Sequence, residues 1–295
     1  MKKISRNVSL VLSSGGARGL THIGAIDALL KRGYNITAVA GSSMGSIVGG
    51  MYASGNLERF REFMCSLSRF DIIRLSDLVV GKSGIIKGEK VFGTLRDFVG
   101  EVNIEDLPLP LAVVAADLVN HSEVVITEGD LLTAIRASSA IPSILTPVNL
   151  NGTLLVDGGV VNPLPIERVH LPKGNIVVAV NVNAPRNESY KPQKNTSDSA
   201  ISKTRKLINA KWNSMTGGHP KRNKASGIFD IVTHSFELMQ HQLTNYALQH
   251  QSPEILLNLP VNLADTFDFH RSKELIELGF TEMEKVLDGY EKNGK

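Results

Sequence analysis

Apolar residues follow two kinds of pattern along this chain of 295 residues. Short, nearly continuous apolar runs are typical of buried strands, and they occur at residues 8–12, 36–40, 111–116, 123–127, 176–182 and 254–258. Between them, apolar residues spaced three and four apart predict helices over residues 20–31, 46–53, 57–67, 89–99, 131–138, 229–249 and 272–287. Residues 70–88 fit neither pattern and are expected to be irregular. This alternation of strands and helices predicts a three-layer α/β/α sandwich around a mostly parallel sheet.

The pattern breaks at residues 184–227, a polar segment with ten basic and two acidic residues, a local net charge of +8. We therefore expect a single domain, made of residues 1–183 and 228–295, with a flexible basic insertion. Within the insertion, apolar residues at helical spacing end in Trp212 and Met215. One interpretation is a basic helix that contacts anionic lipid at a membrane surface, and the other is a solvated insertion whose apolar side packs on the domain.

The composition excludes several classes of protein. The balance of 32 Lys and Arg against 29 Asp and Glu, a net charge of +3, is too even to favour nucleic-acid binding by the whole molecule. The single cysteine excludes an internal disulfide and indicates a reducing compartment, so we expect a cytoplasmic protein, peripheral at the inner membrane surface if the insertion binds lipid. No apolar run approaches the ~18 residues of a transmembrane helix. No His or Cys spacing is typical of a metal site, and we expect neither metal nor cofactor.

Candidate chemistry begins at Gly41-Ser42-Ser43-Met44-Gly45, which lies between a predicted strand and a predicted helix. A sharp strand-to-helix turn of this form is a nucleophile elbow, in which Gly41 and Gly45 leave room for a strained serine. The hydroxyl of Ser43 would then be exposed to a substrate carbonyl, beside the positive end of the following helix. An ordinary glycine-rich turn is the alternative.

Two further stretches support a catalytic interpretation. The loop Ser14-Gly15-Gly16-Ala17-Arg18-Gly19 can direct backbone N–H groups of residues 15–18 toward one point, which suits a tetrahedral oxyanion. Asp157-Gly158-Gly159 follows a hairpin-like apolar run, which places the Asp157 carboxylate at a strand end. A plain Asp-Gly turn is the alternative there.

The three motifs in this order resemble those of bacterial patatin-like phospholipases. The resemblance extends through residues 18–24, 135–142 and 156–165 and covers residues 5–183 in all. It implies a patatin-like α/β/α fold and a Ser–Asp catalytic dyad formed by Ser43 and Asp157. One departure is Ser14, which stands where the family loop usually begins with glycine, and it leaves Gly15 and Gly16 as the oxyanion donors we expect.

Serine needs a neighbouring base to become a nucleophile, and two schemes compete. A Ser-His-Asp triad in the chain order of α/β-hydrolases would use Ser43, Asp157 and either His234 or His270. That fold places several strands before its elbow, whereas one strand and a partial second precede Ser43 here. In the dyad that the resemblance implies, Asp157 is the base. His22 lies just past the glycine loop, at the start of the predicted helix, and we expect it to have a structural role.

The expected function is hydrolysis of carboxylic esters in phospholipids, lysophospholipids or neutral lipids, without a metal. An acyltransferase that uses the same acyl-enzyme is one alternative. A catalytically silent regulator that binds membrane through residues 184–227 is another.

Overall fold

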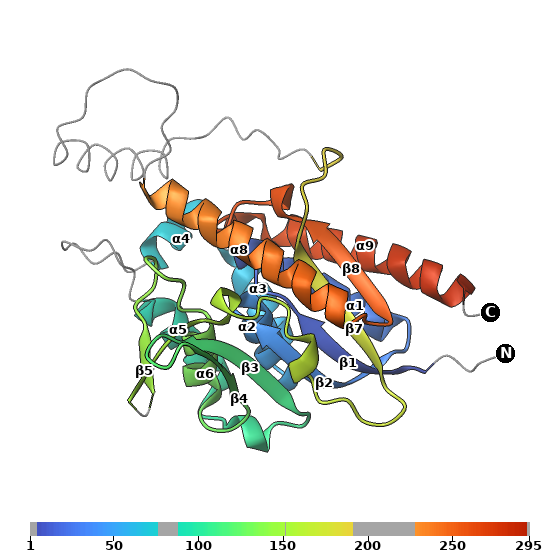
Figure 1. Ribbon diagram of the computed structural model, residues 1–295, viewed down its shortest axis with the longest axis horizontal. Helices are drawn as coiled ribbons and strands as arrows, with labels where there is room; N and C mark the ends of the chain where they lie inside the picture. Colours follow the sequence, from blue (N-terminus) through green and yellow to red (C-terminus); the bar gives the residue numbers. More distant parts are fainter. Residues whose placement is uncertain (1–4, 76–87, 151, 191–227, 294–295) are drawn as a thin grey trace.

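The computed structural model describes residues 5–75, 88–150, 152–190 and 228–293 (Figure 1). Within these ranges one mixed sheet contains the strands β1 (Asn7–Leu12), β2 (Asn35–Ser42), β3 (Leu111–Asp117), β4 (Ser122–Ile126), β5 (Val148–Leu150), β6 (Thr153–Asp157), β7 (Ile176–Ala184) and β8 (Ile255–Pro260). The strands β3, β2, β1, β7 and β8 pair in parallel, while β4, β5 and β6 form an antiparallel extension at β3. The predicted mostly parallel sheet is confirmed.

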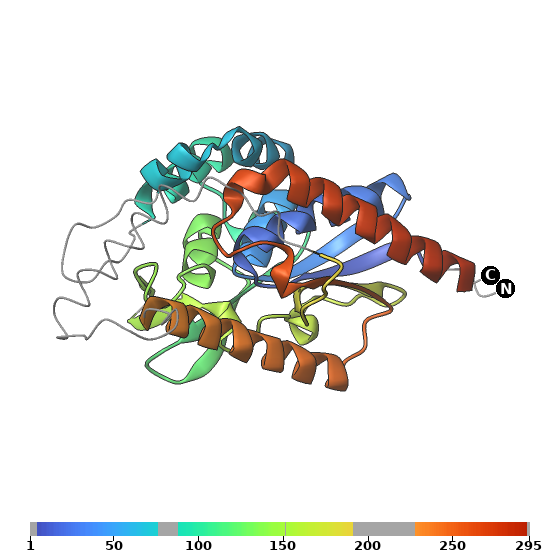
Figure 2. The same ribbon diagram turned by 90° about the horizontal axis from the view of Figure 1, so that it is seen from above.

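Helices cover both faces of the sheet. They are α1 (Thr21–Lys31), α2 (Met44–Ala53), α3 (Leu57–Ser66), α4 (Arg69–Leu75), α5 (Glu89–Val99), α6 (Leu131–Ser138), α8 (Ile228–His250) and α9 (Ser272–Asn293). Figure 2 shows α8 and α9 on opposite sides of the sheet, in orange and red. The larger core, on the α9 side, joins strand residues such as Leu10 and Val178 to α1, α2, α6 and α9. A smaller core on the other face contains Val11 and Ala179, with Leu248 of α8 against it. The α/β/α sandwich is thereby confirmed.

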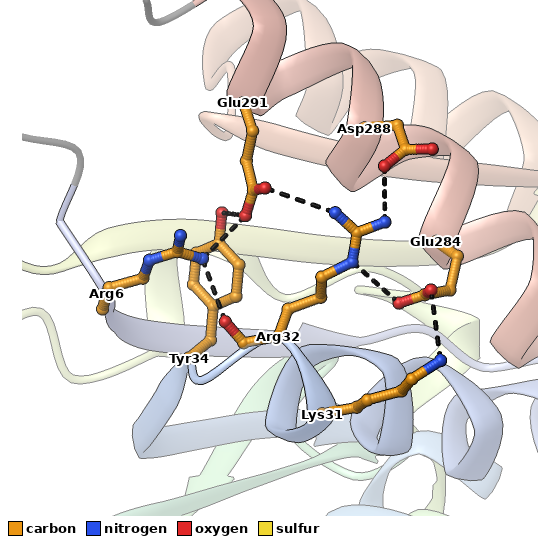
Figure 3. A network of polar contacts seen from close by, with 7 residues as sticks. All are labelled: Arg6, Lys31, Arg32, Tyr34, Glu284, Asp288 and Glu291. Atoms are coloured by element: carbon orange, nitrogen blue, oxygen red, sulfur yellow. Dashed lines mark hydrogen bonds and ion pairs between the residues drawn. The ribbon is translucent and has the colours of Figure 1, made fainter.

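Helices α1 and α9 lie close together at two points where one of them carries a glycine. A Cβ atom at Gly24 would lie 1.9 Å from the carbonyl oxygen of Ile276, and one at Gly279 would lie 2.0 Å from that of Thr21. A polar network then joins the end of α1 and the adjoining strands to α9 (Figure 3). Its ion pairs and hydrogen bonds connect Arg6, Lys31, Arg32, Tyr34, Glu284, Asp288 and Glu291. Together these contacts fix the second helical layer against the first βα unit.

The element boundaries agree closely with the sequence pattern, with one correction. Helix α4 extends from Arg69 to Leu75 and therefore occupies residues 70–75 of the stretch 70–88 that was expected to be irregular. A capping box explains it: the Ser68 N–H donates to Asp71 Oδ2 at 2.9 Å, and the Asp71 N–H donates to Ser68 Oγ at 3.3 Å. Such a Ser-x-x-Asp signal is readable in the sequence.

The basic insertion lies almost entirely outside the described part of the chain. Residues 191–227 are not described, so its expected flexibility and its contact with lipid stay predictions. At its start, the amide of Asn262 donates to the carbonyl oxygens of Asn187 and Tyr190, which ties the described beginning of the segment to the loop after β8.

Candidate active site

The register of β3 brings Ser43 and Asp157 together. Val114 of β3 pairs with Ser42 of β2 on one edge and with β4 on the other, and the next residue, Ala115, pairs with Asp157 of β6 and again with β4. A strand has only two edges, so β2 and β6 must share the edge that β4 leaves. Because β2 runs parallel and β6 antiparallel to β3, their carboxyl ends face each other there. The two motifs meet at this junction.

Ser43 adopts the strained backbone of a nucleophile elbow. Its φ of 53° and ψ of −121° are unusual for a residue with a side chain, and such strain costs about 1–3 kcal/mol. The turn has no room for side chains at either glycine. A Cβ at Gly41 would lie 2.4 Å from the Gly45 carbonyl, and one at Gly45 would lie 2.1 Å from the Leu12 oxygen. Helix α2 begins at Met44, so its positive end lies beside the hydroxyl.

The Ser43 hydroxyl is hydrogen-bonded to the Asp157 carboxylate. Ser43 Oγ donates to Asp157 Oδ2 at 2.5 Å, and the N–H of Gly159 donates to Asp157 Oδ1 at 2.7 Å. Both side chains are buried, Ser43 at 4% exposed and Asp157 at 1%. Burial raises the pKa of Asp157 to about 7 from an ordinary 3.8, against the two hydrogen bonds, which lower it. A carboxyl with a pKa near neutrality is matched to general-base work.

The glycine loop lies on the same side of the junction. Gly15 and Gly16 line the cavity that contains Ser43 and Asp157. The neighbouring amides are engaged elsewhere, since the N–H of Ser14 donates to the Pro163 oxygen and that of Ala17 to the Thr266 oxygen. Ser14 is not among the non-glycine residues with positive φ, so a serine fits its backbone without strain. Gly15 and Gly16 are therefore our candidates for oxyanion donors, while the N–H of Ala17 is occupied.

The side chain of Arg18 is buried, at 2% exposed, and bonded on every side. Its guanidinium donates to the carbonyl oxygens of Val182 and Ala264, to Asn183 Oδ1 and to Glu237 Oε1. Burial lowers the pKa of Arg18, while the nearby carboxylate of Glu237 raises it. Arg18 thus joins the glycine loop to β7 and to α8.

Helix α8 forms a wall of a cavity of about 300 Å³ above the Ser43–Asp157 pair. Apolar side chains from this wall and from the segments that follow α6 and β6 line the cavity, namely Ile141, Val160, Ile231, Val232, Phe236 and Met239. The buried amide of Gln240 also lies beside the dyad. It packs against Gly159, whose N–H donates to Asp157, so closely that a Cβ at Gly159 would lie 2.1 Å from Gln240 Nε2. An apolar cavity with a few polar groups at one end suits an acyl chain whose ester lies at Ser43.

None of the three candidate histidines contacts Ser43. The buried imidazole of His22 donates from Nε2 to the Ser13 oxygen at 2.8 Å, and burial lowers its pKa to about 4, which keeps it neutral. His270 lies beside Arg69 and Asp268. Neither His270 nor the exposed His234 lines the cavity around Ser43. The geometry favours Asp157 as the base.

Three polar residues of the site were given no role from the sequence, although Ser138 lies in the stretch 135–142 that carries the family resemblance. Ser138 Oγ accepts the Ser43 N–H at 2.9 Å and donates to the Val114 oxygen at 2.6 Å, which braces the elbow against β3. Glu237 and Gln240 belong to a helix that the sequence identified only by its apolar spacing. A polar residue at a position expected to be buried in such a helix could have indicated these two residues. Helical spacing alone, however, does not determine which side of a helix faces a site. Within the described residues, no group of three or more His, Cys, Asp or Glu side chains is arranged to hold a metal.

Comparisons with known proteins agree with this arrangement. The family model described as patatin-like phospholipase matches residues 10–170. An uncharacterised NTE family protein of Mycobacterium tuberculosis H37Rv is 32% identical over 334 residues, covering 97% of this chain and 93% of the relative. Lysophospholipase NTE1 of Scheffersomyces stipitis is 26% identical, and the match covers 98% of this chain but 18% of that protein.

Among solved structures, the crystal structure of VipD from Legionella pneumophila has a similar fold. The TM-score is 0.50 at 15% sequence identity, and the match covers 98% of this chain and 67% of VipD. No helix in the described ranges has the length and apolar content needed to cross a membrane. On the family match and the relative of similar length, the chain belongs to the patatin-like phospholipase family.

Proposed function

We propose that the protein is a serine lipid acyl hydrolase that cleaves carboxylic esters of phospholipids, lysophospholipids or neutral lipids. The observation that carries this proposal is the 2.5 Å hydrogen bond from Ser43 Oγ to Asp157 Oδ2 at the base of an apolar cavity. Family membership supports lipid hydrolysis, and the name of the Scheffersomyces stipitis relative, a lysophospholipase, supports a lysophospholipid substrate.

In the first half-reaction, Ser43 Oγ attacks the ester carbonyl carbon while its proton passes to Asp157 Oδ2. The N–H groups of Gly15 and Gly16 stabilise the oxyanion that forms, with help from the positive end of α2. The carbon–oxygen bond to the lipid alcohol then breaks. That alcohol leaves with the proton from Asp157, and the acyl group stays on Ser43.

In the second half-reaction, Asp157 accepts a proton from water, and the resulting hydroxide attacks the acyl-enzyme. Collapse of the second tetrahedral intermediate returns the proton to Ser43 Oγ and releases the fatty acid. The dyad supplies both nucleophile and base, so this scheme needs no metal. We expect activity to persist in EDTA and a fluorophosphonate to label Ser43.

The test is turnover of p-nitrophenyl butyrate and of a lipid panel by Ser43→Ala and Asp157→Asn. Each substitution should lower kcat by at least about 10³-fold, and the double variant should lose little more, because the pair acts as a unit. Ser42→Ala is the matched control, since its buried hydroxyl has no hydrogen-bond partner among the described residues. It should keep wild-type turnover.

Three outcomes would contradict the proposal. Near wild-type turnover by folded Asp157→Asn, with loss in His234→Ala or His270→Ala, would exclude the dyad and support a histidine as the base. Transfer of the acyl group to an added alcohol in preference to water would indicate an acyltransferase. No ester turnover by the wild type would support a silent regulator.

The basic insertion, residues 184–227, is proposed to aid contact with anionic lipid. Its ten basic residues would each contribute about 1 kcal/mol near such a surface, less at high salt. Deleting residues 191–227 should weaken hydrolysis of anionic vesicles and spare the soluble ester. Unchanged vesicle hydrolysis would support a solvated insertion.

A further inference from the structure

Between residues 231 and 250, the exposed side of α8 carries no formal charge. Among residues 231–250, Glu237 is the only Asp, Glu, Lys or Arg, and it turns inward to Arg18. Large apolar side chains are exposed there, at positions seven or eight apart that share one side of the helix. Exposed residues among them, such as Ser235, Gln242 and Gln249, are polar but uncharged. The apolar side chains form the α8 apolar stripe, with exposed fractions of 56% for Ile231, 39% for Val232, 61% for Leu238, 51% for Met239 and 62% for Tyr246.

This stripe is unlike the outer side of an ordinary surface helix. Helices that cover a domain normally show charged or polar residues to solvent, and contiguous exposed apolar surface marks a site of contact. Figure 1 shows α8 running along the outside of the domain, with the sheet behind it. The apolar residues of the stripe therefore need a partner that is not part of the described fold.

The stripe is continuous with the catalytic cavity. Ile231, Val232 and Met239 are exposed on α8 and also line the cavity that contains Ser43 and Asp157. These three apolar side chains thus lead from the outside of the helix to the cavity that contains the reacting groups. A protein seated on the stripe would cover this entrance, whereas a lipid surface would supply substrate through it.

We propose that the α8 apolar stripe is the surface by which the protein docks on a lipid bilayer. The inference rests on the proposed function, since only a lipid substrate gains from this continuity. Ile231, Val232, Leu238 and Met239 insert among the acyl chains, and Tyr246 lies where its ring is apolar and its hydroxyl meets the headgroups. Because the stripe has no formal charge, docking depends on apolar burial and is insensitive to ionic strength.

The test is flotation with phosphatidylcholine vesicles, whose headgroup has no net charge, in the Ser43→Ala background so that no lipid is consumed. Leu238→Glu should weaken vesicle binding by at least about tenfold, because it places a charge in the inserted surface. Leu30→Glu is the matched control, since Leu30 is a half-exposed leucine at 44% on α1, on the far side of the sheet from α8. Its vesicle binding should equal that of the parent at low salt and at about 0.5 M salt.

In protein that retains the native Ser43, Leu238→Glu should leave the turnover of p-nitrophenyl butyrate unchanged, because Leu238 is not among the cavity-lining residues. Leu238→Gln serves as a milder variant if the glutamate variant unfolds, and it should weaken binding by a smaller factor. Binding of either folded variant at the parent level would overturn the proposal, as would absence of vesicle binding by the parent. Conversion of a parent dimer into a monomer by Leu238→Glu would also overturn it and identify a second copy as the occupant.

Failure of the proposed function is distinguishable from failure of this inference. If the wild type hydrolyses no ester, the proposed function is wrong, while the flotation assay still measures whether the α8 apolar stripe binds vesicles. If hydrolysis of the soluble ester is normal and flotation is unaffected by Leu238→Glu, the function stands and the docking surface is wrong. Binding that appears only with anionic vesicles and is lost at high salt would assign docking to the basic insertion and overturn the stripe.

Discussion

The buried guanidinium of Arg18 lies 3.4 Å from the carboxylate of Glu237, across 219 residues of sequence. Arg18 belongs to the glycine loop, and Glu237 belongs to the helix that walls the cavity. Thr266 also donates to Glu237, from Oγ1 at 3.2 Å, close to where its own carbonyl accepts the Ala17 N–H. This contact makes the position of the glycine loop depend on the position of α8.

Glu237→Ala should therefore lower kcat for the soluble ester by about tenfold or more, with a smaller change in KM. The substitution leaves Arg18 with one partner fewer and frees the loop that carries Gly15 and Gly16. We expect the free energy of unfolding to fall by about 1–3 kcal/mol, because a buried cation loses an acceptor. Glu237→Gln keeps an acceptor oxygen and should recover most of kcat. Wild-type kcat in folded Glu237→Ala would contradict a positioning role.

The rate should depend on the protonation of Asp157. The base must be ionised to accept the Ser43 proton, and its pKa is raised to about 7. We expect kcat/KM for the soluble ester to increase tenfold per pH unit below about pH 7 and to level off above it. His22, with a pKa lowered to about 4, should not contribute to this rise. A profile that is flat from about pH 5 to 9 would be inconsistent with Asp157 as an essential base.

Asp157 should also make stability depend on pH, in a direction opposite to that of most carboxylates. Between its ordinary pKa of 3.8 and its folded pKa of about 7, the folded protein binds more protons than the unfolded chain. Stability contributed by this group is therefore lost as pH rises through that window. Three pKa units correspond to about 4 kcal/mol, which is an upper bound on the gain in Asp157→Asn at about pH 8.

Thermal unfolding of wild type and Asp157→Asn at about pH 4.5 and pH 8 measures this effect. The variant should gain little Tm at the lower pH and several degrees at the higher one. Asp117→Asn is the control with the opposite sign. Burial alone would raise the pKa of Asp117, but hydrogen bonds from Asn120 and Val119 outweigh it and lower that pKa. Asp117→Asn should therefore destabilise the protein at pH 8. If the Tm difference between Asp157→Asn and the wild type were the same at both pH values, the raised pKa of Asp157 would be contradicted.

The contact between α1 and α9 should tolerate no side chain at Gly279. The added Cβ of Gly279→Ala would lie 2.0 Å from the Thr21 oxygen, so the helices must separate, and we expect a loss of roughly 1–3 kcal/mol. Gly289→Ala, in the same helix, meets nothing within 4 Å. It should gain about 0.5–1 kcal/mol from helix propensity. Chemical denaturation compares the two, and equal effects would contradict close packing at Gly279.

Much of the fold and the chemistry at each motif could be predicted from the sequence, because both depend on short-range rules. Apolar spacing located six of the strands, and the hairpin-like run before Asp157 indicated β5 and β6. Among the described α-helices only α4 was missed, where a capping box acts locally. The elbow around Ser43 is also local, since its glycines and the strand-to-helix change lie within a few residues. For the pairing of Ser43 with Asp157, the sequence offered a resemblance to other proteins but no physical derivation.

The tertiary structure decided what depends on contacts between distant segments. Ser43 and Asp157 are 114 residues apart, and they meet because β2 and β6 end against each other on one edge of β3, a matter of strand register that no local pattern encodes. Burial at that junction then raises the Asp157 pKa, which the sequence cannot show. The same holds for α8: its apolar spacing predicted a helix, but only packing determined that Glu237 and Gln240 face the site while Leu238 and Tyr246 face solvent.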